Sequence, residues 1–364
     1  MKEFEEYIKQ GEPGRKEKGV IWQTSIGLQQ VDDLIPSPYL IETAREHIEG
    51  GITIEEVKKR LEIYYKTQSS RQDVSEKDRT EEADKVSARI VEILSEATFS
   101  FSPSEYIGIH RRLFKGIYKF AGKIRDYNIT KSEWVLEGKT VFYGSAAVIE
   151  ETLAYDFREE KRFRYAGLSK EEQIAHIARF ISGLWQIHAF GEGNTRTTAV
   201  FSIRYLRTFG FQVENEAFAN HSRYFRNALV RANYNDYTKN IYASMEYLNR
   251  FFENLLLGRP HILRNRELHI RFMAAIKDTN KLGVSKDAAN GLSVNDVKRL
   301  GINLNKNQEK ILELIVSNPK VTIVEMSKQL SVSETAIENN IKKLKEKCLL
   351  TRVGSDKTGH WILL

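Results

Sequence analysis

The sequence has 364 residues, of which 41% are hydrophobic and 29% charged, with 6 Pro, one Cys and a net charge of +7. This apolar content excludes a mainly disordered chain, and no run of about 18 apolar residues predicts a membrane-spanning helix. The lone Cys348 excludes an intramolecular disulfide and a cysteine-based zinc site. The first residues lack a secretory signal pattern, so we expect a cytoplasmic protein without membrane contact. The mild positive charge permits an anionic partner without indicating one.

Low proline content and few short alternating apolar runs favour a mainly α-helical chain of about two or three domains. The first capping-box pattern, Thr53-x-x-Glu56, predicts the start of an early helix. The mixed, glycine-containing stretch 258–303 predicts a linker, and the compact pattern of 304–364 predicts a C-terminal module. Before the linker, the division into an N-terminal helical extension (1–84) and a central domain (85–257) is what the family resemblance described below implies.

The helical pattern of the central domain is interrupted between Arg125 and Tyr143. Apolar residues lie on either side of Glu137-Gly138 in this segment, a pattern that predicts two short strands joined by a turn. A second capping box, Ser169-x-x-Glu172, then predicts a long amphipathic helix that ends at or just before His188.

A glycine-containing turn follows this helix, with Gly191 and Gly193, and the next helix is expected to start near Asn194. Two glycines allow the backbone to point consecutive N–H groups at one place, and the positive end of the next helix adds to that field. Arg196 lies in the first turn of this helix, where a cation is unfavourable unless an anion lies nearby. The pattern predicts a site for phosphate groups.

Two further residues suggest chemistry at this turn. Glu192 would repel bound phosphates unless a divalent cation such as Mg²⁺ bridges them, and His188 has the intrinsic pKa of a general base. Each residue also has a structural explanation, as a core histidine, a solvated carboxylate or a common turn. Their combination within nine residues favours phosphoryl or nucleotidyl transfer. The turn is not a Walker P-loop, because no Gly-Lys-Ser/Thr follows it.

The segment His188-Ala-Phe-Gly-Glu-Gly-Asn-Thr-Arg196 resembles the Fic family motif, His-Pro-Phe-x-Asp/Glu-Gly-Asn-Gly-Arg-x-x-Arg. The resemblance reaches upstream through Ala121-Gly122-Lys-Ile-Arg125 and covers roughly residues 85–257, the range of the central domain. It implies a Fic-type helical bundle with a small β-hairpin, the flap, over residues 126–143. Trp134 near the tip of the flap is either a contact for a partner or a surface aromatic.

The resemblance implies protein AMPylation, the transfer of AMP from ATP to a Ser, Thr or Tyr hydroxyl of a target protein bound along the flap. His188 would then deprotonate that hydroxyl, and Glu192 would hold Mg²⁺. Residues of the turn and of the start of the next helix would bind ATP: Gly191, Gly193, Asn194, Thr195 and Arg196. Two further residues would lie near the adenine: Phe225 and Asn233.

The sequence departs from the family motif at three positions: Ala189 replaces Pro, Thr195 replaces Gly, and Ala199 replaces the second Arg. In the family, that second Arg contacts the γ-phosphate and pairs with an inhibitory glutamate in self-restrained members. The sequence has no strict match to the inhibitory pattern, and Thr80-x-x-x-Asp84 and Ser69-x-x-x-Asp73 are the nearest segments. Two alternatives therefore stay open: a regulator whose Fic domain senses nucleotide or is weakly active, and an enzyme that uses another nucleotide or removes AMP.

The C-terminal module has the pattern of three helices followed by a hairpin, which predicts a winged helix. Basic residues of the third helix and wing suit DNA; they are Lys342, Lys343, Lys345, Lys347, Arg352 and Lys357. Glu334 and Glu338 oppose this interpretation, because they lie in the first half of the third helix, where bases are usually contacted. The module is thus compatible with DNA binding or with protein contacts, to a target or to a second copy of the chain in a homodimer.

Overall fold

The computed structural model describes residues 3–67, 74–211, 213, 216–271, 304–346, 349–353 and 360–363. The chain divides into two compact units, Met1–Leu268 and His269–Leu364, which we describe separately. Most of the predicted linker, residues 272–303, lies outside the described residues. No helix in the described part of the chain combines the length and the apolar character needed to cross a membrane.

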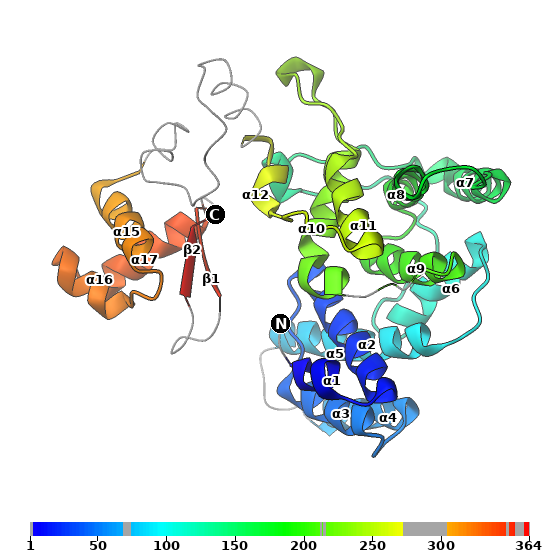
Figure 1. Ribbon diagram of the computed structural model, residues 1–364, viewed down its shortest axis with the longest axis horizontal. Helices are drawn as coiled ribbons and strands as arrows, with labels where there is room; N and C mark the ends of the chain where they lie inside the picture. The colour runs from blue at the N-terminus through cyan, green and yellow to red at the C-terminus, as the bar shows by residue number, and fades with distance from the viewer. Residues whose placement is uncertain are drawn as a thin grey trace. The chain divides into compact units, whose positions relative to one another are not determined.

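The N-terminal part of the first unit is helical, as predicted (Figure 1). Its elements are α1 (Glu5–Gln10), α2 (Pro13–Gly27), η1 (Leu28–Asp32), α3 (Pro38–Glu49), α4 (Ile54–Thr67) and α5 (Val74–Ser95). The Thr53 hydroxyl accepts a hydrogen bond from the Glu56 amide at 3.3 Å, at the start of α4. A Cβ on Gly27 would lie 2.3 Å from the Ala219 carbonyl oxygen, so the end of α2 packs directly against the backbone of α10.

The remaining elements of this unit include one buried helix, α9. They are α6 (Pro103–Phe114), η2 (Trp134–Leu136), η3 (Ala146–Val148), α7 (Ile149–Arg162), α8 (Lys170–Ile187), α9 (Asn194–Thr208), α10 (Glu216–Ala232), η4 (Tyr237–Lys239), α11 (Glu246–Leu257) and α12 (Asn265–Leu268). Every residue of α9 from Asn194 to Leu206 is buried, and the helix packs against α5, α6 and α8 (Figure 1). The predicted capping box of Ser169 and Glu172 is present at the start of α8.

The strands predicted between Arg125 and Tyr143 are not found, although the structure describes this whole segment. Residues Trp134–Leu136 form a short 3-10 helix instead, and Val135 and Leu136 are both fully buried. Two consecutive buried residues break the alternation that a strand needs. The Lys131 amide bonds to the Thr140 side chain rather than to a partner backbone. The predicted β-hairpin flap is therefore a loop, and we call residues 126–143 the flap loop.

The second unit contains the predicted winged helix. It comprises α15 (Lys306–Ser317), α16 (Ile323–Leu330), α17 (Glu334–Glu346) and the antiparallel strands β1 (Leu350–Val353) and β2 (His360–Leu363), in which Arg352 pairs with Trp361. Capping boxes open α15 and α16. The Trp361 indole joins the apolar core of the three helices and donates a hydrogen bond to the Val321 carbonyl at 2.8 Å. Lys347, Cys348 and Lys357 lie outside the described residues.

Candidate active site at the α8–α9 turn

His188 ends α8 in the left-handed region, with φ of 52°, a conformation that non-glycine residues rarely adopt. Its carbonyl oxygen accepts a hydrogen bond from Arg125 Nε at 2.7 Å. The imidazole lies against the Tyr143 ring, with centroids 4.0 Å apart, and is only 6% exposed. Among the described residues, the ring nitrogen Nδ1 has no hydrogen-bond partner, although it is buried. Such orphaned polar atoms are uncommon in proteins and call for a functional explanation.

The His188 imidazole is uncharged at neutral pH. Burial, followed by the positive charge of Lys131, lowers its pKa to about 3. Arg125 and Arg226 add to this effect. An unprotonated ring is able to accept a proton, and negative charge brought by a bound anion would raise its pKa toward the range where it is a stronger base.

The turn itself is held by Asn194 and by a buried histidine of α6. The Asn194 amide donates to the Phe190 carbonyl at 2.7 Å and accepts from the Phe190 amide at 3.0 Å. The Phe190 ring stacks on His110, with centroids 3.7 Å apart. His110 Nδ1 accepts from the Gly122 amide, so Nε2 carries the proton and donates to the Glu192 carbonyl at 3.0 Å. Asn194 therefore positions the turn with its side chain.

Close packing explains the glycines and the threonine of the motif. Gly193 has φ of 78° and precedes α9, and a Cβ there would lie 2.4 Å from the Phe114 ring. A Cβ on Gly191 would lie 2.6 Å from the Tyr127 hydroxyl. The Thr195 hydroxyl accepts a hydrogen bond from the Trp185 indole at 3.0 Å, which ties α9 to α8. Threonine thus has a structural role where the family motif has glycine.

Glu192 pairs with a lysine of the flap loop. Its Oε2 lies 2.5 Å from Lys131 Nζ, and its Oε1 accepts from the Gly193 amide at 3.2 Å. Burial alone would raise the pKa of Glu192, but the bond and charge of Lys131, together with the Gly193 amide, lower it overall. The carboxylate is thus ionised.

The residues present fit a Mg²⁺ ion only if most of its ligands come from elsewhere. Among the described residues, no group of three or more His, Cys, Asp or Glu side chains could hold a metal ion. Mg²⁺ usually binds proteins through one or two carboxylates and completes its shell with phosphates and water. Glu192 is ionised and part-exposed, so it meets the requirement for one carboxylate. In this structure its partner is the Lys131 ammonium.

Arg196 occupies a different environment from the one that the sequence predicted. Its guanidinium is fully buried and pairs with Asp32 of η1 at 2.8 Å and Glu82 of α5 at 2.5 Å. It also donates to Gln29 Oε1 at 3.1 Å and lies 4.9 Å from the centre of the Phe114 ring. Its charge is therefore neutralised from the N-terminal extension, and in this arrangement it does not offer a free cation to phosphates.

The sequence analysis missed both acidic partners of Arg196. Asp84, in the segment nearest to the inhibitory pattern, instead accepts hydrogen bonds from Ser37 and Tyr65. Residues 69–73, the other such segment, lie outside the described residues. Ala199, in place of the second motif arginine, is fully buried. Glu82, two residues before Asp84, is the carboxylate of α5 that reaches the motif.

The two residues predicted near the adenine are not placed at the turn. Phe225 is fully buried and packs on Phe218 and Phe251, with ring centroids 5.0 Å apart in both pairs. A side chain without exposed surface is a core residue, so the prediction for Phe225 is not supported. The Asn233 amide donates to the Ser182 hydroxyl at 2.8 Å, which joins α10 to α8.

Two arginines that the prediction did not include fix the flap loop beside His188. Arg125 donates to four backbone carbonyls, at Tyr127, Gly144, Ile187 and His188, so it joins both ends of the loop to the end of α8. Arg226 of α10 pairs with the buried Glu133 at 3.1 Å, and Glu133 also accepts from the Tyr143 hydroxyl. Arg125 appears in the upstream segment that carries the resemblance, which was the signal for it.

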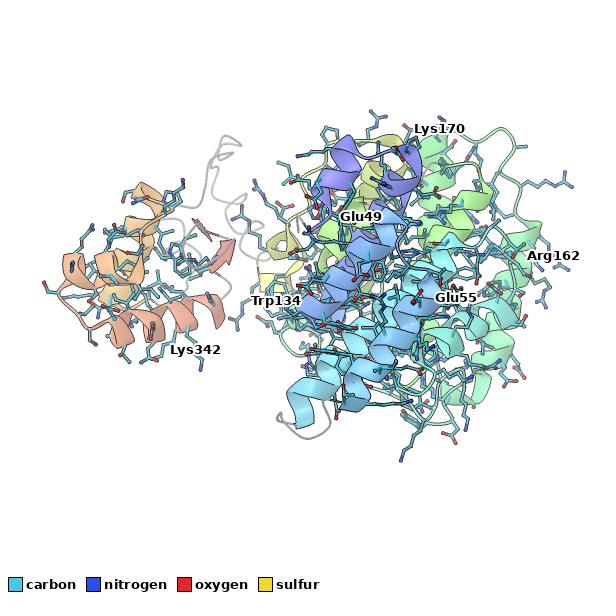
Figure 2. All side chains as sticks on the ribbon, turned by 90° about the horizontal axis from the view of Figure 1, so that it is seen from below. Glu49, Glu55, Trp134, Arg162, Lys170 and Lys342 are labelled. Atoms are coloured by element: carbon cyan, nitrogen blue, oxygen red, sulfur yellow. The ribbon has the colours of Figure 1, made fainter. Side chains whose placement is uncertain are left out.

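Three aromatic side chains of the flap loop are exposed: Phe142 is 82% exposed, Tyr127 53% and Trp134 41%. Trp134 lies at the edge of the first unit (Figure 2).

The second unit offers a basic helix. Lys342, Lys343 and Lys345 on α17 are exposed, and Figure 2 shows Lys342 projecting from the helix. Asn340 instead bonds within the unit, to Asn305 and to the Ala336 carbonyl. Arg352 of β1 lies over the Trp361 ring, 4.7 Å from its centre.

Comparisons with known proteins match two segments of the chain. The sequence profile of the Fic/DOC family matches residues 100–206, and that of a winged helix-turn-helix DNA-binding family matches residues 304–347. The chain therefore contains a Fic/DOC family domain, which includes the α8–α9 turn. It also contains a winged helix-turn-helix domain of the DNA-binding type.

Two solved structures are similar to parts or all of the chain. One is the N-terminal FIC domain of Bep8, a VirB-translocated Bartonella effector protein from Bartonella sp. 1-1C, at 21% identity and a TM-score of 0.41, covering 53% of this chain and 89% of that one. The other is a Fic family protein from Desulfovibrio desulfuricans G20, at 13% identity and a TM-score of 0.40, covering 100% of this chain and 94% of that one. No curated protein matches the sequence.

Proposed function

We propose that the chain is a Fic-type protein adenylyltransferase, with residues 85–257 as its catalytic domain. The observation that carries the proposal is the uncharged, buried His188, whose Nδ1 has no hydrogen-bond partner in the described part of the chain, on the same short turn as the ionised Glu192 and the start of α9. A proton acceptor, a carboxylate and the positive end of a helix at one turn suit nucleotidyl transfer from a triphosphate.

In the proposed reaction, the hydroxyl proton of a target Ser, Thr or Tyr passes to His188. The hydroxyl oxygen bonds to the α-phosphorus of ATP, and the bond from that phosphorus to pyrophosphate breaks. The protein contributes mostly positioning and charge stabilisation, as is usual for transfer at phosphorus. The target lies along the flap loop, where Phe142 and Trp134 offer exposed apolar surface.

Glu192 is the residue that would hold Mg²⁺ in this scheme. The ion, when bound, would offset the negative charge of the triphosphate. Asn194 and Thr195 keep the turn in place through Phe190 and Trp185, so their contribution to nucleotide binding is to position the backbone of the turn.

The proposal is tested by incubating the full chain with α-labelled ATP, Mg²⁺ or Mn²⁺ and cell extract. We expect label on protein with the wild type and at least about a hundredfold less with His188→Ala, the loss typical of a missing general base. His176→Ala is the matched control, because it removes another imidazole of α8, which pairs with Glu160. Equal labelling by wild type and His188→Ala, or none with either metal, contradicts the proposal. Labelled GTP, UTP and CDP-choline test the alternative donors.

A second candidate function is DNA binding by the winged helix, as part of a regulator whose Fic domain senses nucleotide. The exposed lysines of α17 favour it. A gel-shift titration against the DNA upstream of its own gene should show binding that weakens with salt. Replacing Lys342 and Lys343 with Gln should reduce the salt slope by about 2 in log–log terms. If DNA binding is absent or does not depend on salt, the result favours the alternative that this unit contacts protein.

A further inference from the structure

The ion pair between Lys131 and Glu192 conflicts with a static view of the proposed metal site. Lys131 Nζ lies 2.5 Å from Glu192 Oε2, while the other carboxylate oxygen accepts the Gly193 amide. Glu192 is the carboxylate that would hold a divalent cation, so such a cation would compete with the Lys131 ammonium for it.

The backbone around Lys131 is held by hydrogen bonds and ion pairs of its neighbours, whereas its side chain is part-exposed. The Lys131 amide donates to the Thr140 hydroxyl at 3.1 Å, and two residues later the buried Glu133 is bound by Arg226 and Tyr143. The Lys131 side chain itself is 25% exposed, and that of Glu192 is 44% exposed. A lysine is a point charge on a flexible four-carbon stem, and such a group exchanges partners without moving the main chain.

The triphosphate needs a cation that Arg196 does not supply. Arg196 was the residue expected to neutralise phosphates, yet Asp32 and Glu82 already neutralise it in a fully buried position. Lys131 reaches the turn from the flap loop, where it pairs with Glu192, four residues after His188, and it is part-exposed. Its position suits a cation that contacts a ligand bound next to His188.

We propose that Lys131 is a nucleotide-binding residue that changes partners: it neutralises Glu192 in the free protein and moves to phosphate oxygens of the bound triphosphate as a divalent cation takes the carboxylate. The inference rests on the proposed function, since it uses the same turn, and it adds a phosphate ligand from the flap loop. The ammonium and the carboxylate are then each paired in both states. The ammonium pairs with the carboxylate before binding and with phosphate afterwards.

The test measures two equilibria on the full chain with opposite expected changes. Lys131→Met removes the charge and keeps an extended side chain. Mn²⁺ binding without nucleotide, measured by the electron paramagnetic resonance signal of the free ion, should become about five-fold tighter, the size expected for a part-exposed ion pair. Binding of the ATP analogue AMP-PNP in saturating Mg²⁺, measured by calorimetry, should become about ten-fold weaker, because a charge-assisted bond to phosphate is lost.

Three control variants make the result specific. Lys139→Met removes a lysine of the same loop that pairs with Asp236 at 2.7 Å, and it should change neither equilibrium. Lys131→Arg keeps the charge and should retain most of the nucleotide affinity. Adding Glu192→Gln to Lys131→Met should abolish the gain in Mn²⁺ affinity. Thermal melting of each variant confirms that it is folded.

A purely structural role for Lys131 would weaken both equilibria or neither, and either result overturns the proposal. Absence of Mn²⁺ and AMP-PNP binding in wild type and variants overturns both this proposal and the proposed function. Opposite changes in the two affinities without any AMP transfer support the exchange of partners and contradict only the adenylyltransferase assignment.

Discussion

The two basic side chains at the α8–α9 turn differ in burial and in the number of carboxylates that they pair with. On the side of the N-terminal extension, Arg196 is fully buried and bound to two carboxylates. On the side of the flap loop, Lys131 is part-exposed and bound to one, Glu192. A fully buried guanidinium is expensive to move, because its partners would be left uncompensated, whereas a part-exposed ammonium exchanges partners at small cost.

The position of a motif residue therefore does not by itself determine what that residue contacts. Arg196 stands where the motif places a phosphate ligand, and the extension has made it part of the connection between α9, η1 and α5. The cation available to a ligand is instead Lys131 of the flap loop, 61 positions before Glu192. The following predictions test how far the two sides differ.

The largest effect is expected for Arg196→Met. The substitution leaves Asp32 and Glu82 facing one another without the charge that they share. We expect the unfolding free energy of the first unit to fall by about 3 kcal/mol, the lower end for breaking a buried pair, since both carboxylates are part-exposed. Urea unfolding followed by far-ultraviolet circular dichroism measures it. A loss of unfolding free energy below about 1 kcal/mol would show that the buried ion pairs of Arg196 contribute no more to stability than an exposed ion pair does.

The histidine beneath the turn should make the protein sensitive to acid. Burial lowers the pKa of His110 to about 4 from its ordinary value of 6.5. The unfolded chain therefore binds the proton first as pH falls, so the stabilising effect of the neutral ring is complete above pH 6.5 and is lost progressively down to about pH 4. Each such histidine contributes a slope of up to about 1.4 kcal/mol per pH unit in that window.

His110→Gln isolates this contribution, because glutamine still offers one donor and one acceptor for the Glu192 carbonyl and the Gly122 amide. We expect the difference in unfolding free energy between pH 7 and pH 5 to be smaller in the variant. The pKa of His47 is also lowered to about 4, so a residual slope should remain. An unchanged slope would show that His110 is not the group being protonated.

A smaller effect is expected from Glu82→Gln, which removes one negative charge near the turn. Arg196 then keeps Asp32 as its ionised partner, and the field at the start of α9 becomes more positive. We expect AMP-PNP to bind about two- to five-fold more tightly, as for one charge acting through part-exposed surroundings. Glu81→Gln is the matched control, since Glu81 is the preceding residue and pairs with Lys85 on the outer surface of α5. Equal changes in AMP-PNP affinity in the two variants would show that Glu82 has no specific effect on nucleotide binding.

Much of this arrangement followed from the sequence, because it depended on local signals. The capping patterns at Thr53 and Ser169 predicted helices that are present. The two glycines predicted the turn between α8 and α9, and close packing against Phe114 and Tyr127 explains both. These features depend on residues a few positions apart, so a single sequence suffices to find them.

The rest depended on contacts between distant segments, which no local pattern reports. Glu82 meets Arg196 across 114 positions, and its own neighbourhood is an unremarkable polar stretch. Phe225 lies on an amphipathic helix, where the pattern is the same for a core ring and for a ring beside a ligand. The strands of the flap loop were predicted from apolar residues on either side of Glu137-Gly138, but Trp134–Leu136 form a 3-10 helix in which Val135 and Leu136 are both buried.

The smallest effect should come from the exposed side of the turn. Lys131→Met and Glu192→Gln each break an ion pair whose members are both in contact with solvent. We expect each variant to lose less than about 1 kcal/mol of unfolding free energy, because water and salt replace most of what the pair supplies. The same urea titration that measures Arg196→Met gives these values. A loss near that of Arg196→Met would mean that Lys131 holds the flap loop in place, and it would then be too firmly bound to exchange its carboxylate for phosphate.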